Sequence, residues 1–284
     1  MPRHPNRQLA SDFKALHMPG QPFILANAWD AGSARMLAAL GAKAIATSSA
    51  AHAFTLGRPD LGQLTRDEAL AHAQDLMAAV DLPVSGDFEN GFGEAPDVVA
   101  ETVRLSGEVG LAGICIEDTA LPGTGFYEFD LAVERIRAAA SAARALSQDF
   151  TLVARADGVM HGQYDLTEAI RRIQAFDDAG ADALYVPVPG SVQELAAICR
   201  ATNKPVNALA VGPLSKLSMQ DFAALGVARI SLGSALARLT HKAIFEAGTA
   251  MFTGGDFTPL SAMMPGSRVD ALLLAGAAES GEKR

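Results

Sequence analysis

The stretch PDVVAETVRLSGEVGLAGICIED, residues 96–118, contains the two elements from which the whole chain is built. Pro96–Val109 has the apolar spacing of an amphipathic helix, and Gly110 follows where a left-handed helix cap is expected. A short apolar run, Gly113–Glu117, comes directly after this glycine. A glycine-capped helix that leads at once into an apolar strand is typical of a parallel α/β sheet.

The same junction recurs at Gly41, Gly180 and Gly226. The predicted strands are Phe23–Ala28, Ala44–Thr47, Pro83–Asp87, Gly113–Glu117, Thr151–Asp157, Ala183–Val186, Pro205–Leu209 and Arg229–Leu232. The predicted helices are Ala31–Leu40, Arg66–Val80, Pro96–Val109, Leu131–Leu146, Leu166–Ala179, Val192–Ala201, Met219–Leu225 and Ala235–Phe252. Strands that are apolar throughout are buried on both faces of a sheet, as in a closed barrel. The pattern therefore predicts the α/β class and a (β/α)₈ TIM-type barrel.

The length of 284 residues suits one such barrel, which needs about 250 residues. We expect a single domain over residues 1–284, with residues 253–284 as a C-terminal helical extension broken by glycine and proline. Apolar residues make up 49% of the chain, yet no run is long enough to span a membrane. The first residues lack an apolar signal region, and the two cysteines form no metal-ligand cluster, so a cytoplasmic protein is expected. These features and the net charge of −9 predict neither a membrane nor a nucleic-acid partner.

Charged side chains gather where the predicted strands end. The third strand runs into Asp87 and Glu89, the fourth ends at Glu117, and the fifth contains Arg155 near its end. Asp60 lies in the loop after the second strand. The carboxyl ends of barrel strands meet at one face, where such barrels carry their active sites. One acid at a strand end is often only a helix cap, but a set on successive junctions predicts a functional site.

This set of carboxylates has no histidine or cysteine within it, which suits a hard cation, Mg²⁺ or Mn²⁺, rather than zinc. Such an ion leaves positions open to a chelating ligand, and a small 2-oxo acid can bind through a carboxylate oxygen and the keto oxygen. The ion would stabilise the enolate that forms when a nearby carbon bond breaks. It would also attract an anionic substrate to a chain of net charge −9.

A family resemblance rests on five segments that span most of the chain. They are FILANAWDAGSARMLAALGAKAIATSSAAHAFTLGRPD (23–60), LPVSGDFENGFG (82–93), GICIEDT (113–119), LVARADG (152–158) and GVARISLGSAL (226–236). In this order they resemble the isocitrate lyase/phosphoenolpyruvate mutase superfamily. The resemblance implies a metal-dependent barrel enzyme, and its segments do not separate the superfamily's individual activities.

The resemblance also implies roles for matching positions. Asp87, Glu89 and Glu117 would bind the metal, with Asp87 as the direct ligand. Arg155 would contact substrate oxygens and act in catalysis with Glu117, although a structural ion pair with Glu117 or Asp157 stays open as an alternative. The remaining substrate-binding positions would be Thr47, Ser48, Ser49, Asp60 and Asn207.

Two positions depart from the superfamily pattern. The motif after the third strand is commonly Asp-x-Asp, and here its second acid is Glu89. The lyases carry a Lys-x-Cys-Gly-His-type loop after the fourth strand, whereas residues 118–128, DTALPGTGFYE, contain no Lys, Cys or His. Tyr127 is the candidate acid within this loop; His52 and His161, on neighbouring loops, are further candidates that compete with structural roles. We therefore expect slow or absent cleavage of isocitrate and methylisocitrate.

The sequence favours a Mg²⁺-dependent carbon–carbon lyase for a small 2-oxo or 2-hydroxy di- or tricarboxylic acid, acting by decarboxylation, hydrolysis or retro-aldol cleavage. Decarboxylation of a β-keto acid such as oxaloacetate demands least of the site. The alternatives are a phosphonopyruvate-type P–C mutase or hydrolase and a non-catalytic 2-oxo acid binding protein. The apolar segment Ser261–Gly276 predicts a homodimer or homotetramer in which it packs on a neighbouring subunit, and the resemblance implies an exchanged C-terminal helix.

Overall fold

The computed structural model describes residues 5–123 and 125–278. Its main strands are β1 (Phe23–Asn27), β2 (Ala44–Ala46), β3 (Val84–Asp87), β4 (Gly113–Glu117), β7 (Thr151–Arg155), β8 (Ala183–Tyr185), β9 (Val206–Leu209) and β10 (Arg229–Ser231). They close into a barrel in this order, with each strand parallel to both neighbours. The predicted (β/α)₈ barrel is confirmed, with strand ends within one or two residues of the predicted ones.

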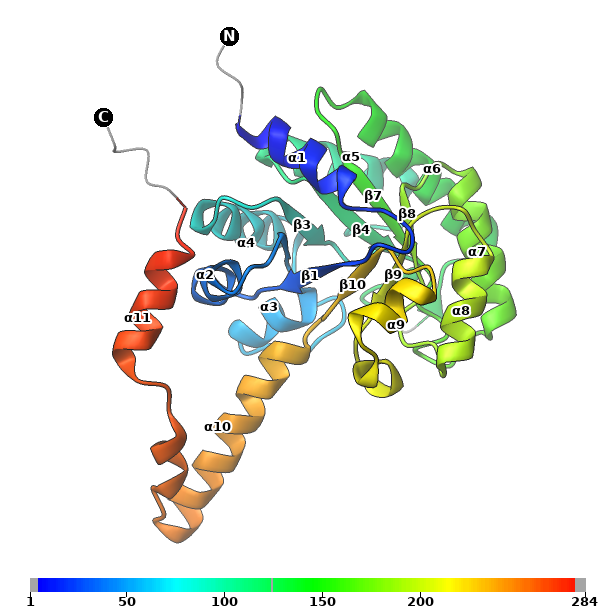
Figure 1. The fold of residues 1–284 in the computed structure, drawn as a ribbon. Coiled ribbons are helices and arrows are strands. Elements are labelled where there is room, and N and C mark those ends of the chain that lie inside the picture. Colours follow the sequence, from blue (N-terminus) through cyan, green and yellow to red (C-terminus); the bar gives the residue numbers. More distant parts are fainter. Residues whose placement is uncertain (1–4, 124, 279–284) are drawn as a thin grey trace.

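Helices cover the outside of the barrel (Figure 1). They are α2 (Ala31–Ala39), α4 (Arg66–Ala79), α5 (Pro96–Val109), α6 (Phe129–Ala145), α7 (Leu166–Asp178), α8 (Val192–Arg200) and α9 (Met219–Ala224), with a 3₁₀ helix at Gly212–Lys216. The four predicted glycine caps, Gly41, Gly110, Gly180 and Gly226, all have positive φ angles between 88° and 104°. Glycine adopts this left-handed conformation without the steric cost of a Cβ atom.

Besides the 3₁₀ helix, a few elements were not predicted. Helix α1 (Pro5–Ala15) packs the fully buried Phe13 against Phe23 and the starts of neighbouring strands, which closes the barrel floor. Helix α3 (Ser49–Thr55) follows β2, and a two-stranded hairpin, β5 (Thr119–Ala120) with β6 (Gly125–Phe126), follows β4. These elements are short or lie outside the repeated βα pattern, so their sequence signals are weak.

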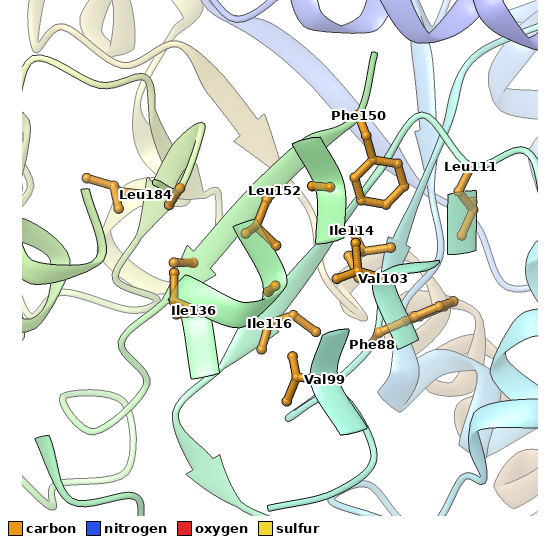
Figure 2. Packing of buried hydrophobic residues seen from close by; sticks show 14 of the residues in the cluster. Phe88, Val99, Val103, Leu111, Ile114, Ile116, Ile136, Phe150, Leu152 and Leu184 are labelled. Atoms are coloured by element: carbon orange, nitrogen blue, oxygen red, sulfur yellow. The ribbon is translucent and has the colours of Figure 1, made fainter. Parts of the chain in front are cut away.

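A large part of the core lies between α5, α6 and the outer faces of β4 and β7. Figure 2 shows Val99 and Val103 of α5 and Ile136 of α6 beside Ile114 and Leu152 of the strands. Full burial of one such side chain contributes about 1.5–3 kcal/mol. Alternate residues of a strand face opposite sides of the sheet. Because Ile114 and Leu152 face outward, the last residues of their strands, Glu117 of β4 and Arg155 of β7, face the inside of the barrel.

The C-terminal arm, residues 235–276, leaves the barrel. Helix α10 (Ala235–Gly254) projects outward, a 3₁₀ turn follows at Thr258–Ala262, and α11 (Gly266–Ala275) returns to pack on α2 (Figure 1). The predicted segment Ser261–Gly276 therefore contacts its own chain here. Within the described part of the chain, no helix is both long and apolar enough to span a membrane.

Candidate active site

A pocket of about 130 Å³ opens at the carboxyl ends of the strands. This volume is well below the roughly 300–1,000 Å³ of pockets for drug-sized ligands, so it suits a small acid. Seven of the predicted site residues line it: Ser48, Ser49, Asp60, Asp87, Glu89, Glu117 and Arg155. The carboxyl ends of the barrel strands thus bring together residues that are far apart in the sequence.

Arg155 is the centre of this pocket. Its guanidinium lies 2.9 Å from Asp87, 3.1 Å from Glu117 and 2.5 Å from Asp157. Burial opposes its charge, but these carboxylates raise the pKa of Arg155 above its usual range. The ion pairs with Glu117 and Asp157, left open by the sequence, are both present. Arg155 therefore orders the acidic groups and also faces the pocket.

Glu117 at the end of β4 lies deep in the pocket and is 6% exposed. Burial raises the pKa of Glu117 well above its usual range, although the charge of Arg155 acts in the opposite direction. A buried carboxyl group beside an arginine is an unusual arrangement that is frequent in functional sites.

Asp87 is held from four sides. The amide and hydroxyl of Ser49 both donate to its Oδ2 atom at 2.9 Å, while Cys115 Sγ at 3.3 Å and Arg155 donate to Oδ1. The amide of Asp87 donates to Thr47 Oγ1 at 2.7 Å. Thr47 therefore orders the acid from outside the pocket lining. Ser48 caps α3 by accepting from Ala51 and also lines the pocket.

Glu89 and Asp60 form the acidic rim on the other side of Asp87. Glu89 is 4% exposed, has a left-handed φ of 46°, and accepts a hydrogen bond from the amide of Gly62 at 3.1 Å. Burial, with the charges of Asp87 and Asp60, raises the pKa of Glu89 to about 7. Desolvation and the charge of Asp87 also raise the pKa of Asp60. These acids repel one another in the absence of a counter-charge between them.

The donor set fits a hard divalent cation. It consists of carboxylate oxygens, which Mg²⁺ and Mn²⁺ prefer, and the mutual repulsion of Asp60, Asp87 and Glu89 is what a cation would relieve. Within residues 5–123 and 125–278, no three acidic, histidine or cysteine side chains already form a metal cage. Arg155 and Ser49 occupy the oxygens of Asp87 instead.

Besides Thr47, two predicted residues lie outside the pocket lining. Tyr127 is buried in the core, where its hydroxyl accepts from Asn90 Nδ2 at 2.9 Å and Arg135 covers its ring at 3.9 Å. Tyr127 therefore contacts the loop after β3 and does not line the pocket. Asn207 points into the barrel one layer below the pocket, bonded to Arg229 and Ser231 at 2.8 Å each.

The sequence did not assign Asp118, whose carboxylate supports the site from behind. It accepts from the amide of Asp157 at 2.9 Å, the hydroxyl of Tyr164 at 2.7 Å and Arg172 at 2.9 Å. Asp118 follows Glu117 directly at the end of β4, so its strand-end position was the available signal. Its partners come from a later loop and helix, which the sequence pattern cannot place.

Comparisons with known proteins place the chain in a family. A sequence model of the phosphoenolpyruvate phosphomutase family matches residues 13–252. An uncharacterized protein of Mycobacterium tuberculosis is 36% identical over 78% of this chain and 81% of its own. The 2,3-dimethylmalate lyase of Eubacterium barkeri is 32% identical over 66% and 64% of the two chains. An oxaloacetate decarboxylase of Pseudomonas putida is 28% identical over 87% and 86%.

Solved structures give the same result. A Burkholderia cenocepacia protein described as a lyase/mutase superposes with a TM-score of 0.89 and 47% identity, over 94% and 96% of the two chains. Oxaloacetate acetylhydrolase bound to its product oxalate gives a TM-score of 0.81 and 26% identity, over 93% of each chain. Because the family match spans most of the chain, the protein belongs to the phosphoenolpyruvate phosphomutase family and is an enzyme of the isocitrate lyase/phosphoenolpyruvate mutase superfamily.

Proposed function

We propose that this enzyme is a divalent-metal-dependent carbon–carbon lyase for a small 2-oxo dicarboxylic acid, with decarboxylation of an oxaloacetate-type substrate as its reaction. The observation that carries the proposal is the buried guanidinium of Arg155 facing a 130 Å³ pocket rimmed by carboxylates. Two relatives, a decarboxylase and an acetylhydrolase, act on oxaloacetate by name, which supports this substrate class.

The predicted metal ligands would hold the cation on one side of the pocket: Asp87, Glu89 and Glu117. When bound, the cation supplies positive charge that polarises the 2-oxo group of the substrate. Arg155 lies on the β7 side of Asp87 and Glu117. Its planar fork is suited to paired oxygen atoms, so it can bind the 2-oxo acid end and stabilise charge that grows on the enolate oxygen.

In the reaction, the C3–C4 bond of the substrate breaks and the C4 carboxylate leaves as CO₂. The electron pair of that bond becomes the enolate of pyruvate, and C3 then gains one proton. Ser48 and Ser49 line the pocket and can donate to a substrate carboxylate. Leu121 of the loop after β4 also lines the pocket and helps to exclude water. This reaction requires no loop cysteine, which agrees with residues 118–128.

The family match itself favours the second candidate, P–C bond chemistry on a phosphonopyruvate-type substrate. Against it, Arg155 is the one Lys or Arg among the described residues that line the pocket, and three carboxylates already share its charge. A phosphonate would bring more negative charge than a carboxylate to the same place. The non-catalytic alternative is not carried forward because the named relatives are enzymes.

The proposal is tested by following pyruvate formation from oxaloacetate with Mg²⁺, with Mn²⁺ and with chelator. We expect metal-dependent turnover on the order of 10 s⁻¹ with oxaloacetate and much slower reaction with isocitrate, methylisocitrate and phosphonopyruvate. Rates that do not change on chelation would contradict the metal requirement. Faster turnover of phosphonopyruvate than of oxaloacetate would favour the second candidate.

We further propose that the enzyme assembles as a homodimer or homotetramer through the C-terminal arm. Apolar side chains on this arm are largely uncovered, with 73% of Phe245 and 90% of Phe252 exposed. An apolar cavity of about 490 Å³ also lies between α2, α10 and α11. Large exposed apolar surfaces commonly mark protein interfaces, and a second copy of the chain would cover both features.

A further inference from the structure

The proposed reaction ends when C3 of the enolate gains a proton, and the structure leaves few groups to donate it. The loop after β4 contains no Lys, Cys or His, and the hydroxyl of Tyr127 is bonded within the core. The thiol of Cys115 already donates to Asp87 Oδ1 at 3.3 Å, so its proton is engaged within the acidic cluster. With Asp87, Glu89 and Glu117 assigned to the cation, the remaining candidates for the donor lie on the other elements that line the barrel mouth.

We infer that His161 is the proton donor of this enzyme. It lies on the loop between β7 and α7 and lines the same pocket as Asp60, Asp87 and Arg155. Its Nε2 atom is buried and has no hydrogen-bond partner among residues 5–123 and 125–278. Buried polar atoms usually have a hydrogen-bond partner, so an unpaired nitrogen on a residue that lines the pocket is available to a group of the substrate.

The ring of His161 is held in place from the loop after β4. Its centroid lies 5.8 Å from that of Phe126 on β6, and Phe126 packs edge-on against Tyr164 at 5.5 Å. Tyr164 is fixed in turn by its hydrogen bond to Asp118. These contacts use the faces and edges of the rings. They therefore orient His161 without using its Nε2 atom.

Other described histidines lie elsewhere, including His52, the alternative that the sequence left open. His52 stacks on His72 with ring centroids 3.8 Å apart, outside the barrel mouth, and its Nδ1 lies 3.4 Å from Thr55 Oγ1. His17 lies at the opposite end of the barrel, against Phe13 and Phe23. The structure therefore separates two histidines that the sequence could not distinguish.

The step rests on the proposed lyase reaction and balances without a further reactant. After CO₂ has left, the Nε2–H bond of protonated His161 breaks, the C=C electron pair of the enolate takes this proton as the new C–H bond at C3, and a lone pair of the enolate oxygen re-forms the keto group of pyruvate. His161 recovers a proton from water. Histidine is the side chain that most often performs such transfers, which contribute about 10²–10⁴-fold to rate.

The reverse of this step gives a direct test, because the enzyme should exchange the methyl protons of pyruvate with D₂O without making or breaking a carbon–carbon bond. Exchange is followed by proton NMR with Mg²⁺ for the native enzyme and for His161→Asn, with His161→Gln as a second variant. Oxalate affinity is measured by calorimetry as a binding readout. We expect exchange to fall by about 10²-fold or more while oxalate affinity stays within about threefold. The control, His52→Asn, should match the native enzyme in both measurements.

Three outcomes would overturn the inference, and they are distinguishable. Exchange by both His161 variants within about twofold of native would exclude His161 as the donor and leave the lyase reaction standing. A parallel loss of oxalate affinity and exchange would make His161 a binding residue. A native enzyme that binds oxalate, yet neither decarboxylates a 2-oxo acid nor exchanges pyruvate protons, would contradict the proposed function and this role together.

Discussion

The barrel mouth and the C-terminal arm differ in whether their side chains have contacts within the chain. At the mouth, Arg155 has a side chain only 12% exposed and contacts three carboxylates of its own chain. On the arm, Phe245 and Phe252 are 73% and 90% exposed, and among the described residues of α10 only Ala237 is buried. The charge of Arg155 is therefore paired within one chain, whereas the arm has apolar surface left for a partner.

This difference assigns the two regions to different tasks. Buried ion pairs hold the pocket in one geometry, which is what a site that stabilises a transition state requires. Uncovered apolar side chains give the isolated subunit little stability and can contribute only when another surface covers them. A substitution at the mouth should therefore disturb folding or chemistry, and a substitution on the arm should disturb assembly.

The largest expected effect comes from Arg155→Ala. It leaves Asp87, Glu117 and Asp157 buried without their shared cation, and breaking a buried ion pair in this way costs about 3–5 kcal/mol. Urea unfolding should show a loss of this size in the free energy of unfolding. An arginine that only bound substrate could be removed with little loss of stability. We do not expect this for Arg155, because it forms these ion pairs.

Arg104→Ala is the matched control for this comparison. Arg104 also pairs with two carboxylates, Glu101 and Glu108, but its side chain is 47% exposed on the surface of α5. Water replaces exposed ion pairs at little cost. Equal destabilisation by the two substitutions would show that burial does not distinguish the mouth from the surface.

The next effect concerns ligand binding. Asp87→Asn removes the charge of the predicted direct metal ligand. Removal of a residue that only supports a metal ligand typically weakens metal affinity by roughly 10–100-fold. Calorimetry should therefore show that Asp87→Asn weakens the binding of oxalate and Mg²⁺ by more than this. Asp97→Asn makes the same change on the exposed first turn of α5 and should leave binding unchanged. Oxalate binding by Asp87→Asn with native affinity would exclude the metal site. Oxalate binding by the native enzyme in chelator would exclude it too.

The pH dependence of stability tests whether burial also controls protonation at the barrel floor, where His17 lies. Burial and the charge of Arg229 lower the pKa of His17 from its ordinary 6.5 to about 3. Below pH 6.5 the unfolded chain takes up a proton that the folded chain refuses, so His17 should lower stability by about 1.4 kcal/mol per pH unit between pH 6 and pH 4, while the raised pKa of Glu89 acts in the opposite direction. His17→Asn should flatten this slope in urea unfolding. Some slope remains because burial also lowers the pKa of His72, to about 4. An unchanged slope would mean that His17 becomes protonated in the folded chain.

The sequence predicted the barrel well because its signals are local and repeated. Glycine-capped helices before four of the apolar strands reveal the repeated βα unit, and closure of the barrel follows from strands buried on both faces. Asp87, Glu89, Glu117 and Arg155 were found because they occupy strand ends, which the fold brings together.

The sequence could not show which way a side chain on a loop or a strand points. Tyr127 faces the core, and Asn207 lies below the pocket. The partners of Arg155, the choice between His161 and His52, and the packing of α11 on α2 all depend on contacts between distant segments. Such contacts have no local signature in the sequence.

The smallest expected effect on the subunit itself comes from Phe245→Glu combined with Phe252→Glu on α10. Both side chains are exposed within one chain, so their replacement should change the unfolding free energy of the subunit by no more than about 0.5 kcal/mol. If a second copy covers them, however, two buried charges would oppose association, and sedimentation should show the assembled mass fall to that of one 29.5 kDa chain. Thr249→Glu adds negative charge to an exposed position of the same helix and should leave the mass unchanged. A native protein that sediments as a monomer at micromolar concentration would contradict the assembly. An oligomer that survives the double substitution would place its interface away from these two phenylalanines.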